Sequence, residues 1–179
     1  MRVSHVLLLL ALLVTTRTAT ARGELPEECA DETTQAASAR GARPADAHKA
    51  RVIGAAAAAQ ALAETWSPRT LTELNEYDVK VVRVAGAFTW HAHNHTDELF
   101  VLLSGELDID FEEASGLPQA QLRATGDIVS VPRGVNHRPA TPTGTEATIL
   151  LVEPAGLINT GDAAHSSLTA RQGQWLEWE

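Results

Sequence analysis

The chain has 179 residues but only one cysteine, and it has fewer basic than acidic side chains. A single cysteine, Cys29, excludes an internal disulfide and argues against a closed zinc site, which is usually built from thiolates. Cys29 can only pair between chains or remain a thiol near the start of the chain. The 14 basic residues face 23 acidic ones, which gives a net charge of −9. Such a surface repels phosphate backbones, so a nucleic-acid partner is not expected.

Long apolar runs are also scarce. The exception is the nine-residue run Val6–Val14, which follows Arg2 and precedes the small residues of Ala19–Ala21. The run is too short to cross a bilayer as a helix, and its setting is typical of a secretory signal peptide. We therefore predict that residues 1–21 are a cleaved signal peptide and that the protein enters the secretory pathway or is extracellular. The alternative is an uncleaved signal that tethers the chain to a membrane; after cleavage no membrane contact is expected.

Residues 22–65 differ in composition from the rest of the chain. They are rich in alanine and show no β-strand alternation, and they include the run Ala55–Ala59. Alanine has the highest helix propensity, so residues 50–65 favour a helix, which Gly54 weakens modestly. This stretch is predicted to be a loose or partly helical N-terminal extension.

From Trp66 onward the sequence shows short β-strand patterns separated by turn residues. The predicted strands are Val79–Val84, Ala87–His93, Leu99–Leu103, Leu107–Phe111, Gln121–Ala124, Ile128–Val131, His137–Ala140 and Ala147–Val152. No helical pattern lies between them, which excludes an alternating βαβ fold and favours antiparallel strands in a sandwich or barrel. Residues 66–162 are predicted to form one all-β domain, and residues 163–179 a C-terminal tail.

Histidines cluster within residues 91–98 of this domain. His91 and His93 are two residues apart, so in a strand both side chains point to the same face. Glu98 follows a short polar stretch that can turn the chain, and His137 arrives from a distant strand. Three neutral imidazoles and one carboxylate suit a divalent transition metal, and a six-coordinate ion would keep positions open for water or a small-molecule ligand.

The spacing of these residues resembles that of the cupins. The first cupin motif is represented by Gly86, His91, His93, Glu98 and Gly105. The second is represented by Gly126, Pro132, Gly134 and His137, with Thr141 where the family has an asparagine. Gly86 lies one residue closer to His91 than the family pattern has it, and the absent asparagine is not a metal ligand. The wider sequence is similar to small single-domain cupins of type 2, which are labelled mannose-6-phosphate-isomerase-like.

This resemblance implies a double-stranded β-helix, the RmlC-like jelly-roll barrel, with one metal ion inside it. Small cupins of this ligand set favour Fe, Mn or Ni, with Zn or Cu as alternatives. Members often form homodimers. The strand pattern adds a second argument. The alternation that points His91 and His93 inward points Phe88 and Trp90 outward, where the other sheet, the N-terminal extension or a second subunit would cover them.

Three roles for the metal remain open. The first is a metal-dependent enzyme acting on a small oxygen-bearing substrate, the second a non-catalytic module that binds a metal and a small ligand, and the third a metal that only stabilises the barrel. An acid–base isomerase needs a proton-transfer group near the metal. The sequence shows no second inward carboxylate or lysine, so dioxygenase-type chemistry is favoured over isomerase chemistry.

Overall fold

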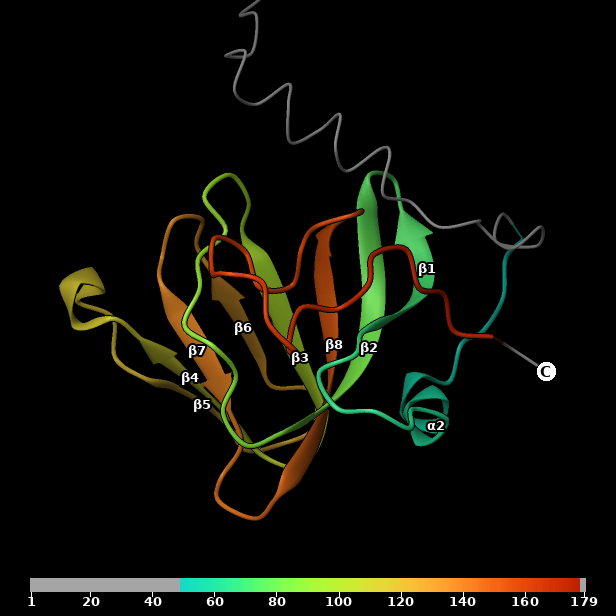
Figure 1. Cartoon of the computed structure of the whole chain (residues 1–179). Coiled ribbons are helices and arrows are strands. Elements are labelled where there is room, and N and C mark those ends of the chain that lie inside the picture. Colours follow the sequence, from blue (N-terminus) through green and yellow to red (C-terminus); the bar gives the residue numbers. More distant parts are fainter. Residues whose placement is uncertain (1–48, 178–179) are drawn as a thin grey trace, which may run out of the picture.

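The computed structural model describes residues 49–177 (Figure 1). The predicted signal peptide, the first part of the extension, Cys29 and Trp178 lie outside the described residues. The eight strands are β1 (Arg69–Leu74), β2 (Tyr77–Ala85), β3 (Glu98–Ser104), β4 (Leu107–Phe111), β5 (Ala120–Leu122), β6 (Ile128–Val131), β7 (His137–Ala140) and β8 (Glu146–Pro154). One short helix, α2 (Ala55–Gln60), and one 3-10 turn, η1 (Glu113–Ser115), complete the described elements.

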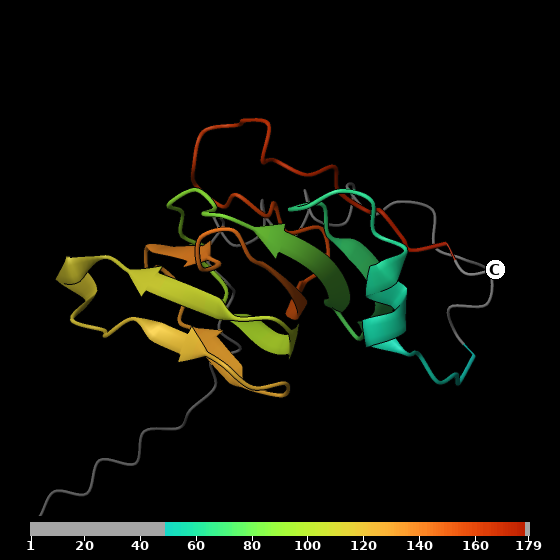
Figure 2. The ribbon, with the colours of Figure 1, turned by 90° about the horizontal axis from the view of Figure 1, so that it is seen from below.

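The strands form two antiparallel sheets that face each other. The larger sheet has the order β1-β2-β8-β3-β6, and the smaller has the order β5-β4-β7 (Figures 1 and 2). Strands that are distant in sequence, such as β2 and β8, are neighbours, so the chain crosses over itself as a jelly roll does. The predicted all-β double-stranded β-helix is therefore confirmed.

The interior of the barrel is apolar at one end and polar at the other. Side chains alternate inward and outward along β8, where Ala147, Ile149, Leu151 and Glu153 are all buried. The first three belong to the main hydrophobic core, and burial of each Ile or Leu contributes about 1.5–3 kcal/mol. Glu153 continues the same inward row. The strand pattern thus carries charged side chains into the polar end of the barrel.

The predicted strand Ala87–His93 is not a regular strand. Only two isolated bridges form there, Ala87 with Ala140 and His91 with His137, and their register differs by one residue. Pro139 lies between the two partners on β7 and has no N–H to donate, so the ladder is interrupted. As a result Phe88 is buried rather than outward-facing, whereas Trp90 is exposed as predicted.

The two ends of the described chain pack on the outside of the larger sheet. Ala58, Ala59 and Leu62, in and just after α2, form a second apolar cluster with Leu71 and Val81 of the sheet, joined by Leu176. The predicted helix over residues 50–65 is confirmed only in part, since α2 has six residues. No helix within residues 49–177 combines the length and apolar character needed to span a membrane.

Candidate metal centre

Three of the four predicted ligands converge at the polar end of the barrel. His91 precedes β3, Glu98 is the first residue of β3, and His137 is the first residue of β7. One ligand atom from each lies within 4.8 Å of the other two, and all three side chains are buried. His91 and His137 also exchange backbone hydrogen bonds of 3.1 and 2.9 Å, which fix the two imidazoles side by side.

Backbone carbonyls set the orientation of these two rings. The Nδ1 of His91 lies 3.1 Å from the Thr89 carbonyl, and the Nδ1 of His137 lies 3.0 Å from the Val135 carbonyl. A carbonyl oxygen can only accept, so each neutral ring carries its hydrogen on Nδ1. The lone pair then resides on Nε2, which is the arrangement that a metal-binding histidine requires.

Glu98 faces these lone pairs. Its Oε2 lies 3.2 Å from the Nε2 of His137 and 3.6 Å from the Nε2 of His93. A carboxylate oxygen and an unprotonated imidazole nitrogen are both acceptors, so they do not attract each other at this distance. Either a proton between the two groups or a metal cation bound to both must reconcile them.

His93 lies beside Glu98 but outside the three-residue cluster. Its ring centroid is 5.1 Å from that of His91 and 6.2 Å from that of His137. Its Nε2 is buried and has no hydrogen-bond partner among the described residues. An unpaired buried nitrogen is costly, and it is explained if the atom binds an ion. The prediction that His93 is the fourth ligand remains a prediction.

Burial disfavours charged forms in the metal-free site. Loss of solvent, together with the smaller effect of the neighbouring His137, lowers the pKa of His91 to about 3 and that of His93 to about 4, from an ordinary value of 6.5. Burial raises the pKa of Glu98 from 4.5 to about 7; His137 opposes this rise, and Glu153 adds to it. His91 and His93 are thus unprotonated at neutral pH, as metal binding requires.

Aromatic rings enclose the cluster. The rings of Phe88 and His91 meet edge to face at 5.3 Å, and Phe88 stacks on Trp66 at 4.7 Å. On the other side, Phe100 meets the His137 ring at 6.2 Å, as expected from a residue that shares the inward parity of Glu98. A dimer was predicted partly because Phe88 and Trp90 were both expected on the outer surface. Since Phe88 is buried, only Trp90 remains there.

The sequence reasoning missed three charged residues close to this cluster. Asp78 and Lys80 of β2 and Glu153 of β8 are buried on the inward side of the larger sheet. The statement that no second inward carboxylate or lysine accompanies the predicted ligands is therefore wrong. The alternation of Asp78-Val-Lys80-Val was a usable signal, since it sets both polar side chains on one face. Their distance from Glu98 depends on strand register, which the sequence does not show.

Comparison with known proteins places these features in context. A family model described as a cupin domain matches residues 79–153. A cupin-2 domain containing protein from Shewanella frigidimarina, known from its crystal structure, is 37% identical. That match covers 53% of this chain and 86% of that chain, with a TM-score of 0.48.

Two further proteins are similar over part of their length. The uncharacterized protein YdbB of Bacillus subtilis is 38% identical over 69 residues, which are 38% of this chain and 58% of that protein. This chain thus spans less than two thirds of that curated relative. Hydroquinone 1,2-dioxygenase from Sphingomonas sp. TTNP3 is 19% identical, with a TM-score of 0.52 over 64% of this chain and 35% of that one. At that identity the likeness concerns the fold alone.

Proposed function

This chain belongs to the cupin-2 domain family, and we propose that it is a metal-dependent enzyme acting on a small oxygen-bearing substrate. The ion would be one divalent transition metal, with Fe, Mn or Ni favoured over Zn or Cu. His91, Glu98 and His137 would hold it, and His93 would be the fourth ligand. The buried cluster of His91, Glu98 and His137 supports a metal site at this place. The addition of His93 as a fourth ligand is part of our proposal.

One observation carries this proposal: acceptor atoms face one another in the buried cluster. The Nε2 of His137 lies 3.2 Å from the Oε2 of Glu98, and the Nε2 of His93 has no hydrogen-bond partner among the described residues. A single proton on Glu98 can satisfy only one of these nitrogens. A divalent cation satisfies all of them together, so the donor set fits the ion that the family implies.

The chain's own residues prepare the site for a guest. The carbonyls of Thr89 and Val135 hold two imidazoles in one orientation, and Phe88 and Phe100 provide dry walls beside them. When bound, the ion would supply Lewis acidity, and a redox-active ion would also exchange electrons. The low local dielectric would strengthen the pull of the site on a substrate oxygen.

The reaction type has two candidates. Dioxygenase-type chemistry is our first proposal, as the sequence favoured it. The argument from the sequence against isomerisation no longer holds, because Glu153 is a second buried carboxyl group beside Glu98 and a carboxyl group can carry a proton. An isomerase is therefore the second candidate. A non-catalytic module that binds a metal and a small ligand is the alternative to both.

Elemental analysis of the purified protein, supplied with Fe²⁺, Mn²⁺ or Ni²⁺, tests the metal. We expect about one ion per chain, lost in His137→Ala and reduced in His93→Ala. His95→Ala is the matched control, because His95 belongs to the same segment but is exposed. A protein that retains no ion, or a His137→Ala variant that retains it fully, would refute the proposal.

Turnover then separates the candidate reactions. The metal-loaded protein is offered small diols, keto acids and sugars while oxygen uptake and product formation are followed. Oxygen consumed with product supports a dioxygenase, and conversion without oxygen supports an isomerase. Tight binding without turnover supports the binding module.

We further propose secretion and a homodimer. The apolar run within residues 1–21 supports export, and mass spectrometry of the mature N-terminus would test cleavage after Ala21.

Exposed Trp90 supports a dimer only weakly, because the Arg138 guanidinium already covers its ring at 5.0 Å. Light scattering of the purified protein would establish the subunit number.

A further inference from the structure

Three carboxylates lie in one row across the polar end of the larger sheet. Asp78 on β2 pairs directly with Glu153 on β8. On the other side of β8, Leu99 pairs with Val152, so Glu98 stands next to Glu153. All three carboxylates are buried, with Glu153 fully so. Like charges opposite one another on a sheet face destabilise it, so this row needs a compensating positive charge.

Lys80 supplies part of that charge. It is one of only two lysines in the chain, and it is buried two residues from Asp78 on the same face of β2. Its Nζ lies 2.7 Å from the Oε1 of Glu153 and 3.6 Å from the Oδ2 of Asp78. Burial opposes the charged form, yet the two carboxylates outweigh it and raise the pKa of Lys80. Lys80 is thus a fixed cation.

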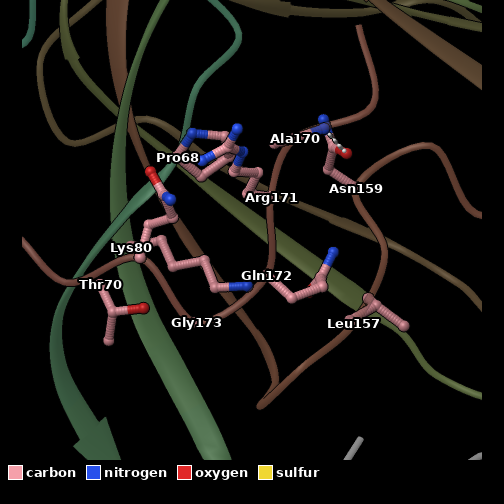
Figure 3. Close-up of a pocket in the computed structure, with 10 residues that line it drawn as sticks. Pro68, Thr70, Lys80, Leu157, Asn159, Ala170, Arg171, Gln172 and Gly173 are labelled. Atoms are coloured by element: carbon pink, nitrogen blue, oxygen red, sulfur yellow. Dashed lines mark hydrogen bonds between the residues drawn. The ribbon is translucent and has the colours of Figure 1, made fainter. Parts of the chain in front are cut away.

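The C-terminal segment lies next to Lys80. Figure 3 shows the side chain reaching from β2 towards Gln172 and Leu157. A cavity of about 10 Å³ lies between them, which is room for about one water. The Oε1 of Gln172 is buried without a partner among the described residues. This cavity thus separates Lys80 from the C-terminal segment.

Glu153 faces the cluster instead. One of its oxygens is bound to Lys80, and the other, Oε2, has no donor among the described residues. Its near neighbour on β3 is the Glu98 carboxyl, which can donate a hydrogen bond only when protonated. With all groups ionised, Asp78, Glu98, Glu153 and Lys80 leave two net negative charges in a buried region. That excess equals the charge of one divalent cation.

We propose that Glu153 acts on the metal centre from behind Glu98: its negative charge strengthens ion binding, while the positive charge of Lys80 weakens it. This inference rests on the proposed function, since it assumes that an ion is held by Glu98 and the histidines. It assigns Glu153 and Lys80 opposite effects on metal affinity. A purely structural role for the pair predicts effects of the same sign.

Chelator competition with Mn²⁺ alone measures the two effects. Glu153→Gln is expected to lower the affinity for Mn²⁺ by about 10–100-fold, as loss of a group behind a ligand commonly does. Lys80→Met is expected to raise the affinity, because one repelling charge is removed. The double variant, Lys80→Met with Glu153→Gln, keeps two net negative charges and should bind nearly as tightly as the wild type. Glu146→Gln, on the same strand but exposed, is the matched control.

The outcomes separate this inference from the function on which it rests. A wild type that binds no ion refutes both. A wild type that binds Mn²⁺ while Glu153→Gln binds it equally well refutes the role of Glu153 alone, and equal losses in both single variants show a structural effect and refute the inference. If Lys80→Met does not fold, the double variant must still bind more tightly than Glu153→Gln, and failure to do so overturns the inference.

Discussion

Substitution of Glu98 by glutamine should stabilise the metal-free protein at alkaline pH. Glu98 is buried next to Glu153, and burial raises its pKa to about 7 from an ordinary 4.5. The folded state therefore prefers the protonated carboxyl, whereas the unfolded chain ionises it freely. The stability that this preference provides is fully present below pH 4.5 and is lost as the pH rises through 7.

The size of the effect follows from the two pKa values. A carboxyl with a pKa of about 7 when folded and 4.5 when unfolded loses about 3 kcal/mol of folding free energy across that interval. Glutamine is neutral at every pH and has nearly the same shape, so it avoids this loss. At pH 8 the metal-free variant should be more stable than wild type by about 3 kcal/mol, which corresponds to roughly 6–12 °C in melting temperature.

Thermal or urea unfolding of the two proteins in chelator, from pH 4.5 to pH 8, checks this prediction. The difference in unfolding free energy between the variant and wild type should be near zero at pH 4.5 and should increase as the pH rises. The histidines titrate in both proteins, so they largely cancel in the difference. With metal at 1,000 times its dissociation constant the order should reverse, because the ion then stabilises wild type by about 4.1 kcal/mol, more than the loss of about 3 kcal/mol. A gap that does not change with pH would refute the reasoning.

Three further predictions concern the surroundings of the site. Phe88→Ala should lower the free energy of unfolding by about 3–5 kcal/mol, measured in urea, because it empties the space beside the His91 ring. In the metal-free glutamine variant, stability should fall as the pH drops below 6.5, because the folded pKa values are about 3 for His91 and about 4 for His93; a melting temperature that is flat from pH 7 to pH 5 would contradict this. Gly105→Ala should cost about 1–3 kcal/mol more than Gly144→Ala. Both residues have a left-handed backbone, but of the two only Gly105 would bring an added Cβ against the backbone carbonyl oxygen of Glu146. Equal melting temperatures for these two alanine variants would show that the contact is relieved without cost.

Much of the fold was predictable because strand signals are local. Alternation in Leu107–Phe111 and the β-strand pattern of Ala147–Val152 placed two strands correctly. The strand β1 was missed, since Arg69–Leu74 has weak alternation and depends on its pairing with β2. Ala87–His93 was predicted as a strand because its pattern fits one, yet the missing N–H of Pro139 on the distant β7 interrupts the ladder.

The sequence by itself determined the chemistry that this protein can hold. The residue types and spacing of His91, His93, Glu98 and His137 indicated a buried cluster of metal-ligand type, because side-chain parity along a strand is a local property. Only the tertiary structure decided what lies behind that cluster. The register between β8 and β3 places Glu153 beside Glu98, the register between β2 and β8 brings Lys80 to Glu153, and register is set by the packing of the whole barrel. A charge in a sequence becomes costly or useful only when burial removes its solvent, and burial is a property of the fold.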